Sequence, residues 1–203
     1  MPPMSPPTLT QSRPRHSAPP LKVLGDLQLA PGRAHEICGP ARHFGAMLVA
    51  RATRGPIFWI APAWDHARLN GDGLVPFTEP GRLSFLTPNR ADDLLWSMEE
   101  ALRAGCVPLV IADLPAPPAL TPVRRLHLAA ETGGGAALGL LLTPGDGGAA
   151  GVESRWHLAP RHRATHRTWA LERRRARSAP PKSWAIEHTM QGFTLSSAKI
   201  AES

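Results

Sequence analysis

Short apolar runs separated by longer mixed segments set the pattern of this chain. Four of the runs are bounded by Gly or Pro, as is typical of buried strands in a parallel sheet. They lie at 32–38, 57–61, 107–114 and 137–142, and LSFLT at 83–87 predicts a further strand. The segment 65–80, which carries several Gly and Pro, is predicted as loop.

Three segments are predicted as helices, at 44–53, from Asn89 to Gly105, and at 123–132. The middle one has the clearest signals, with Asn89 as N-cap, Asp92 at the third position of a capping box, and Gly105 as the stop. Its apolar residues share one face: Leu94, Leu95, Met98, Ala101 and Leu102.

Polar and apolar residues alternate in three later segments, at 154–159, 167–172 and 183–187. Such alternation predicts antiparallel strands with one wet face. Strands that alternate with helices and then give way to antiparallel strands indicate an α/β fold. We expect a mostly parallel sheet flanked by helices, with antiparallel strands at the C-terminal end.

Three regions follow from this pattern and from the prolines. Residues 1–21 are predicted to be a disordered Pro-rich leader, residues 22–172 the α/β domain, and residues 173–203 a basic extension with a final strand and a flexible tail. The tail GFTLSSAKIAES carries Phe193, Leu195 and Ile200, so it is predicted either to dock on a partner or to fray.

The composition excludes some classes of protein. The chain has 203 residues, 42% of them hydrophobic, but no apolar run approaches the roughly 18 residues that a membrane span needs. The first twenty residues hold seven prolines and no apolar core, so they do not resemble a secretory signal. We therefore expect no membrane segment and a cytoplasmic location.

The cysteines and tryptophans are predicted to serve packing. Cys38 and Cys106 lie in apolar stretches without a CxxC partner and are predicted to be reduced core thiols. His35 and Cys38 have the spacing of half a metal site, but no second half is visible, so no metal is expected. Of the six tryptophans, Trp169 and Trp184 are predicted to make surface contacts.

Positive charge is concentrated late in the chain. The net charge is +7, and the segment 155–182 holds nine basic residues against one acid, while the remaining residues carry 14 basic and 15 acidic groups. Such a block is typical of contact with nucleic acid or with an acidic protein. A solvated edge strand with a basic loop is the alternative.

The stretch HEICGPARHFGAM at 35–47 resembles a phosphate-binding loop that has lost its chemistry. Gly39, Pro40, His43 and Gly45 stand where a glycine-rich loop would lie, but the Lys and the Ser or Thr that such a loop uses are missing. His43 could meet a phosphate or be solvated. Asp113 ends an apolar strand, as a metal-supporting acid would, and is either a relic of that role or a structural cap. We expect no ATPase activity and no cofactor.

The order of these elements is similar to the ATPase core of the RecA superfamily, and several phrases resemble one family within it. These phrases are GRAHEICGPA, GPIFWIAPAW, DDLLWSMEEALRAG, TPVRRLHLAAETGG, LGLLLTP, ESRWHLAP and TWALERRRAR. They resemble the ImuA proteins of bacterial damage-inducible mutagenesis cassettes over roughly Gly32 to Glu187.

The resemblance implies an accessory role in error-prone translesion synthesis during the SOS response. The implied partners are ImuB, RecA and an error-prone replicative-type polymerase. A SulA-like inhibitor of cell division and a degenerate but active ATPase are the alternatives.

The resemblance also bears on contact with DNA. In RecA-like recombinases the loop that corresponds to PGDGGAAGV contacts single-stranded DNA, but here it has one acid and no basic residue. The basic segment is the better candidate for binding DNA or a partner, because phosphate contacts depend on charge. Its candidate residues are Arg161, Arg163, Arg167, Arg173, Arg174, Arg175 and Arg177.

Overall fold

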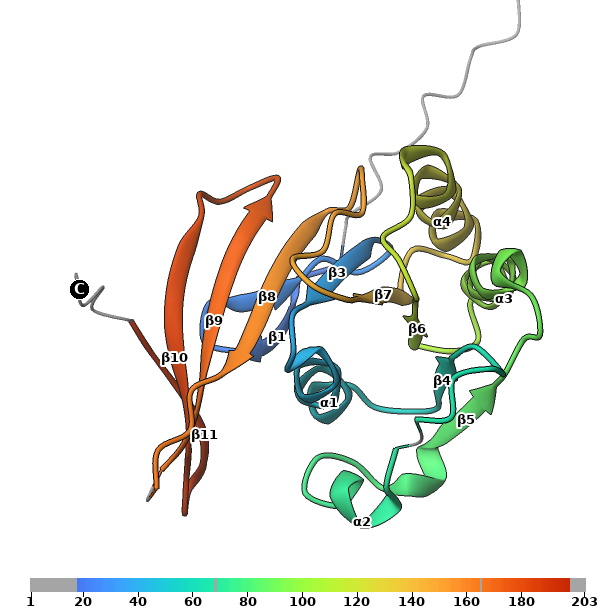
Figure 1. Ribbon diagram of the computed structural model, residues 1–203. Coiled ribbons are helices and arrows are strands. Elements are labelled where there is room, and N and C mark those ends of the chain that lie inside the picture. Colours follow the sequence, from blue (N-terminus) through green and yellow to red (C-terminus); the bar gives the residue numbers. More distant parts are fainter. Residues whose placement is uncertain (1–17, 68, 165, 198–203) are drawn as a thin grey trace, which may run out of the picture.

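A computed structural model describes residues 18–67, 69–164 and 166–197, and it shows an α/β fold. Within these residues one nine-stranded sheet runs through the molecule, with strand order β11-β10-β9-β8-β3-β7-β6-β4-β5 (Figure 1). The strands of its parallel part are β3 (Ala34–Cys38), β4 (Ile57–Ile60), β5 (Leu83–Leu86), β6 (Leu109–Asp113), β7 (Leu138–Thr143) and β8 (Ser154–Pro160). The predicted mostly parallel sheet is therefore confirmed.

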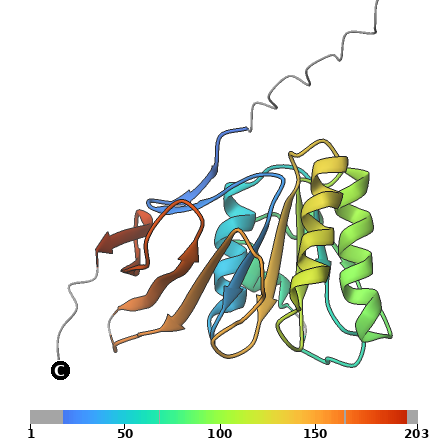
Figure 2. The same ribbon diagram turned by 90° about the horizontal axis from the view of Figure 1, so that it is seen from above.

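Helices cover both faces of the parallel strands. They are α1 (Arg42–Ala52), α3 (Ala91–Ala104) and α4 (Leu120–Thr132), and the segment predicted as loop also holds the short α2 (Gly71–Leu74) and η1 (Pro80–Arg82). The buried residues of α1 pack on one face of the sheet and those of α3 and α4 on the other, where these two helices lie side by side (Figure 2). Both faces of the central strands are buried, which explains their continuous apolar runs.

Helix α3 begins later than the sequence indicated. It starts at Ala91 with Arg90 as N-cap, and no side chain caps it, so the prediction of Asn89 as N-cap with a capping box was wrong. Asp92 and Asp93 still lie in the first turn, where their charges favour the positive end of the helix dipole. The predicted stop is confirmed, because Gly105 has a φ of 66°.

The antiparallel part of the sheet continues the domain and is not an extension. It consists of β9 (Arg167–Ala176), β10 (Lys182–Thr189) and β11 (Gly192–Ser197). Strand β9 runs through the predicted boundary between residues 172 and 173, and Trp184 and Ile186 of β10 belong to the same core as α1. The cut at that boundary was therefore wrong, because one strand cannot belong to two separately folded units.

Three strands were not predicted, in addition to the short α2 and η1. A hairpin of β1 (Leu21–Leu24) and β2 (Leu27–Leu29) packs Leu27 and Leu29 into the core beside α1, so ordered structure already begins at the last residue of the predicted leader. Strand β11 places Phe193 and Leu195 against the same core. The rest of the tail, Ile200 included, and residues 1–17 of the predicted leader lie outside the described residues.

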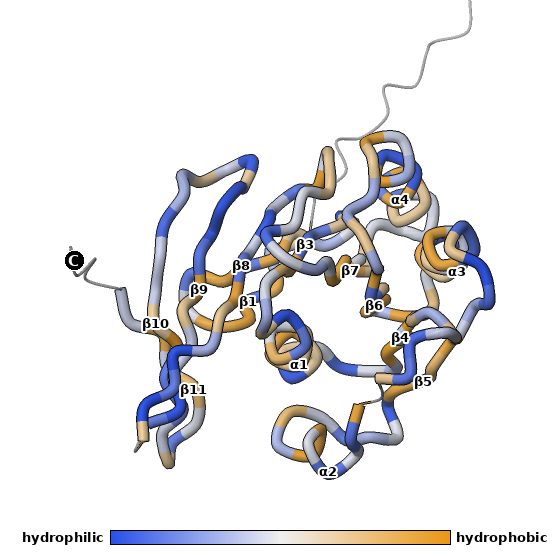
Figure 3. The backbone as a smooth tube through the Cα atoms, in the orientation of Figure 1, coloured by the Kyte–Doolittle hydropathy of each residue, from blue (hydrophilic) through white to orange (hydrophobic). Residues whose placement is uncertain are grey.

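Hydrophilic residues are most concentrated in the antiparallel part of the sheet. The strongest hydrophilic segment is the part of β9 that leads toward β10, where the sequence reads ERRRAR (Figure 3). Among the described residues no helix has both the length and the apolar character needed to span a membrane.

Candidate functional site at the carboxyl edge of the parallel strands

The connection between β3 and α1 is short. Only Gly39, Pro40 and Ala41 separate the strand from the helix. Gly39 has a φ of 94°, and a Cβ built on it would lie 2.4 Å from the carbonyl oxygen of Leu158 in β8. Both facts require glycine, because a left-handed conformation and a backbone contact this close exclude a side chain.

Two backbone N–H groups at this connection already have partners. Pro40 has no N–H, the N–H of Ala41 donates to the carbonyl of Leu158 at 3.1 Å, and the N–H of Arg42 donates to the carbonyl of Gly39 at 3.2 Å. A phosphate-binding loop needs such groups to point outward at the anion. Two of the N–H groups that could point at an anion are therefore used within the fold.

Gly45 does not belong to the loop. It is the fourth residue of α1, and a Cβ built on it would lie 2.9 Å from Cγ2 of Ile37 in β3. The prediction that it forms the second glycine of a degenerate phosphate loop was wrong. Glycine at this position lets the helix approach the strand closely.

Asp113, at the end of β6, faces the first turn of α1. The Nε2 atom of His43 lies 2.5 Å from its Oδ2, and Nε of Arg42 donates to Oδ1 at 3.4 Å. The carboxylate is mostly buried, with 12% of its side chain exposed, whereas the imidazole is 39% exposed. Of the roles considered for Asp113, the geometry matches the structural one, since both carboxylate oxygens bind side chains of the helix.

A small pocket adjoins this ion pair. It has a volume of about 120 Å³ and is lined by His43, Trp59, Ala61, Ala67, Leu69, Phe85, Thr87 and Asp113. Sites for drug-sized ligands and cofactors usually measure about 300 to 1,000 Å³. This one has room for only a few water molecules, whose share of liquid volume is roughly 30 Å³ each. It is too small for a nucleotide.

A buried carboxylate that the sequence analysis missed fixes the loop at 144–151. Glu36 of β3 is fully buried and accepts hydrogen bonds from Thr143, from the N–H groups of Gly148 and Ala149, and from Nε of Arg155. Burial opposes ionisation of Glu36, but these donors outweigh it and lower its pKa. A charged residue inside an apolar strand was the only sequence signal. The loop is tied to the sheet by this carboxylate.

The seven candidate arginines do not form one surface. Arg161, Arg163 and Arg167 lie where β8 turns into β9, whereas Arg177 follows the far end of β9. Ten residues of extended strand separate Arg167 from Arg177, which corresponds to about 33 Å at the usual rise of a strand. The segment that looks like a single basic block in sequence is therefore spread along a whole strand.

The arginines of the far end are largely occupied. Arg174 forms ion pairs with Asp146 at 2.9 Å and with Glu172 at 3.1 Å, and the hydrogen bond from Arg174 lowers the pKa of Asp146. The guanidinium of Arg173 lies over the ring of Trp184 at 5.1 Å and donates through Nε to the carbonyl of Pro180. These groups hold the structure together. Arg175, by contrast, is exposed.

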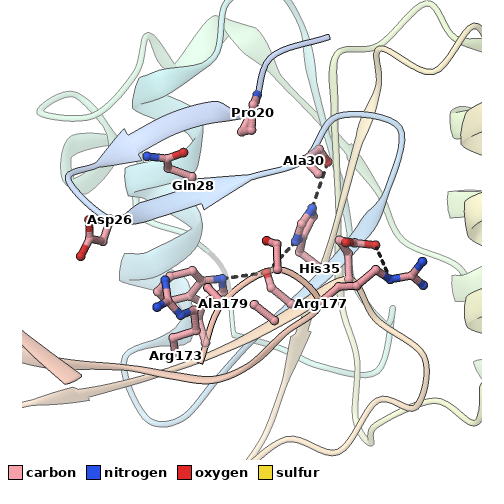
Figure 4. A pocket seen from close by; sticks show the side chains of 13 residues that line it. Pro20, Asp26, Gln28, Ala30, His35, Arg173, Arg177 and Ala179 are labelled. Atoms are coloured by element: carbon pink, nitrogen blue, oxygen red, sulfur yellow. Dashed lines mark hydrogen bonds and ion pairs between the residues drawn. The ribbon is translucent and has the colours of Figure 1, made fainter. Parts of the chain in front are cut away.

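A pocket of about 230 Å³ lies between this end of β9 and the hairpin β1–β2. Figure 4 shows Arg173, Arg177 and His35 around it. Glu153, 3.6 Å from Nε of Arg177, and Asp26 balance the two arginines, so the lining carries no net charge. The pocket therefore has no electrostatic preference for an anion.

His35 is part of a buried hydrogen-bond chain beside this pocket. Its Nε2 donates to the carbonyl oxygen of Ala30 at 3.0 Å, so Nδ1 of the neutral ring accepts from the hydroxyl of Ser154 at 2.7 Å. Nε1 of Trp156 donates to the same hydroxyl oxygen. Burial lowers the pKa of His35 to about 4, although the hydrogen bond to Ala30 opposes the shift. His35 and Cys38 lie three residues apart on one strand and face opposite sides of the sheet. They cannot share a metal.

The two cysteines differ in environment. Cys38 is buried, and burial together with the charge of Glu36 raises the pKa of its thiol to about 12. Cys106 is exposed, so its assignment to the core was wrong. Within the described residues no three His, Cys, Asp or Glu side chains come together as a metal site.

The two tryptophans predicted to make surface contacts pack against the core, Trp184 fully and Trp169 in part. Trp184 is buried, and Trp169 stacks on Phe44 of α1 with ring centroids 3.9 Å apart. The exposed tryptophans are Trp64 and Trp96, at 47% and 57%. The alternating pattern of β9 and β10 located the strands correctly but did not reveal that α1 covers one of their faces.

No protein-family model matches the chain, and no curated protein matches its sequence. The ImuA resemblance therefore stays a prediction.

Proposed function

We propose that the chain is a non-catalytic accessory protein of SOS-induced error-prone translesion DNA synthesis. It acts as an adaptor or regulator that binds ImuB, RecA and an error-prone replicative-type polymerase. The resemblance of the phrases between Gly32 and Glu187 supports the family and the partners. The arrangement of the sheet supports a RecA-like core, because β3 and β6 place the connection at Gly39 and the acid Asp113 at the same edge, one strand apart.

The contact between His43 and Asp113 carries the proposal that catalysis is absent. In ATPases of this kind an acid at the end of a strand supports the metal ion that neutralises the phosphates. Here both oxygens of the acid bind side chains of α1, and the N–H groups of Ala41 and Arg42 are already used. This removes two N–H donors and the metal-supporting acid from the electrostatic stabilisation of the phosphoryl group, which is the main source of catalysis in these enzymes.

The test has two arms with the full-length protein. In the first, immobilised protein is incubated with purified ImuB or RecA in moderate salt without nucleotide, and capture of at least one of them is expected. In the second, phosphate release from ATP with Mg²⁺ is measured, and a rate equal to that of the blank is expected. Failure to capture either protein contradicts the adaptor role, whereas hydrolysis above the blank contradicts only the loss of catalysis.

A further inference from the structure

The turn between β8 and β9 is an extended two-stranded ribbon and not a loose loop. Beyond the named strands the N–H of Arg161 donates to the carbonyl of Thr168 at 2.9 Å. Arg163 and His166 form a bridge with N···O distances of 3.0 and 3.2 Å. We call residues 161–164, 166 and 167 the hairpin tip. Because its backbone is held by ladder hydrogen bonds, the directions of its side chains are set by the alternation of a strand.

Alternation places arginines on both faces of this ribbon. Residues directly opposite each other in an antiparallel pair share a face. Arg161 and Arg163 therefore lie on one face with Thr168, and all three line a groove of about 500 Å³ on the outer side of the sheet. Arg167 lies on the other face, two residues before Trp169, which packs toward α1.

The three guanidinium groups of the hairpin tip are available. None of the side chains of Arg161, Arg163 and Arg167 forms an ion pair or a hydrogen bond with any residue that the structure describes, in contrast to Arg174 and Arg177. One acid, Glu187, shares the groove. The tip therefore presents an excess of unpaired positive charge.

Its aromatic neighbour is not available for stacking. One face of Trp169 is covered by Phe44, with the rings 9° from parallel, and His162 meets Trp169 at 90° with centroids 4.8 Å apart. Proteins that bind single strands rely on open aromatic faces for the bases. The structure offers charge without such a platform, which favours a partner that is recognised through its phosphates.

We propose that the hairpin tip enters a groove of duplex DNA and contacts phosphates on both of its walls. The major groove is about 12 Å wide and admits a two-stranded ribbon. Cations on both faces of the ribbon then meet the phosphate rows on either side. An acidic peptide would cover only one face at a time. The inference goes beyond the proposed adaptor role, because the contact requires neither ImuB nor RecA.

The experiment measures binding of the full-length protein to a short fluorescein-labelled DNA duplex by anisotropy over a range of salt concentrations. In the test variant Arg161, Arg163 and Arg167 are replaced by Ala. We expect its affinity at low salt to fall roughly tenfold or more, and the slope of log K against log salt to become shallower by about 2 to 3, one step per lost phosphate contact.

Two further variants make the result specific. The control replaces Arg54, Arg90 and Arg124, which are exposed and lie outside the tip, by Ala, so its net charge equals that of the test variant. The second replaces the three tip arginines by Lys, which retains charge and should retain most of the affinity. Circular dichroism confirms that each variant is folded.

Three outcomes would overturn the proposal. One is equal weakening in the test and control variants, which indicates a general charge effect. Another is binding of a single-stranded oligonucleotide as tightly as the duplex. The third is displacement of the duplex by poly-glutamate at matched charge concentration, which indicates an acidic protein as partner. Because ImuB and RecA are absent from the assay, none of these results bears on the proposed partner binding.

Discussion

His43 in the first turn of α1 places Nε2 2.5 Å from Oδ2 of Asp113 at the end of β6, and this contact joins two elements 70 residues apart in sequence. Arg42 binds the other oxygen of the same carboxylate at 3.4 Å. The helix thus supplies two side chains to the one acid that a metal ion would need. Both oxygens of the acid at this edge of the sheet are therefore occupied by side chains of the protein itself.

Removal of that carboxylate should therefore cost stability. Asp113→Ala leaves Arg42 and a partly buried imidazole without their partner, so we expect the free energy of unfolding to fall by about 1 to 3 kcal/mol. Urea unfolding measures the loss. His43→Ala should cost less when Asp113 is already absent, with a coupling of about 0.5 to 2 kcal/mol in a double-mutant cycle. Additive effects of the two substitutions would show that the contact does not stabilise the fold.

Substitution of Gly39 or Gly45 by alanine should destabilise the fold, because neither position has room for a Cβ. Gly39→Ala forces a φ of 94° on alanine and places its Cβ against a backbone oxygen, so we expect the soluble yield to collapse. At Gly45 the Cβ would meet side-chain atoms of Ile37 and Leu158, and overpacking typically costs about 1 to 3 kcal/mol. Thermal unfolding of Gly45→Ala measures this cost. If Gly39→Ala were as stable as Gly45→Ala, the left-handed conformation and the backbone contact would not be what requires glycine at position 39.

The sequence predicted the strands and helices of the parallel part well, because buried strands there are continuous apolar runs bounded by Gly or Pro. It failed where the outcome depended on contacts between distant segments. Gly45 resembled a loop glycine because a three-residue connection cannot be recognised before the start of α1 is known. The hairpin β1–β2 was hidden because Leu27 and Leu29 are buried only by packing against the core beside α1.

The candidate site shows the same limit. Asp113 and His43 were both recognised, but their contact with each other depends on the strand order, which places β3 one strand away from β6. The basic segment was recognised by charge, yet its division into a free tip and a paired far end depends on acids from other segments, Asp146 and Glu153. Sequence spacing carries no information about those partners.

Glu36 is predicted to control the loop at 144–151. Glu36→Gln leaves the partly buried Arg155 without its counter-charge, and the loss of one partner in such a contact typically costs about 1 to 3 kcal/mol. The amides of Gly148 and Ala149, which donate to Glu36, should then exchange faster with deuterium. The amides of β7 report on global opening and serve as the reference. Unchanged exchange at Gly148 and Ala149 would contradict the role of Glu36 in the loop.

The buried His35 should make stability depend on pH. Its pKa is about 4 in the folded protein against an ordinary value of 6.5, so the unfolded chain binds the proton more readily. The contribution of His35 is complete above pH 6.5 and is lost as the pH falls toward 4, on the order of 3 kcal/mol in total. Urea unfolding at several pH values measures it.

A comparison with His35→Gln isolates this contribution, because the pKa values of His127 and His157 are also lowered by burial and act in the same direction. Between pH 6.5 and 4 the stability of His35→Gln should decline less steeply than that of the unmodified protein. Parallel curves for the two proteins would contradict the assignment.

The two thiols should react at very different rates. Cys106 is exposed, whereas Cys38 is buried and its pKa of about 12 leaves almost no thiolate at neutral pH. Because the thiolate is the reactive form, a thiol-specific reagent should label Cys106 in the native protein and Cys38 only after denaturation. Mass spectrometry of the labelled peptides tests this, with Cys106→Ser as the matched control that should give no native labelling. Rapid labelling of Cys38 in native buffer would show that the loop over Glu36 opens readily.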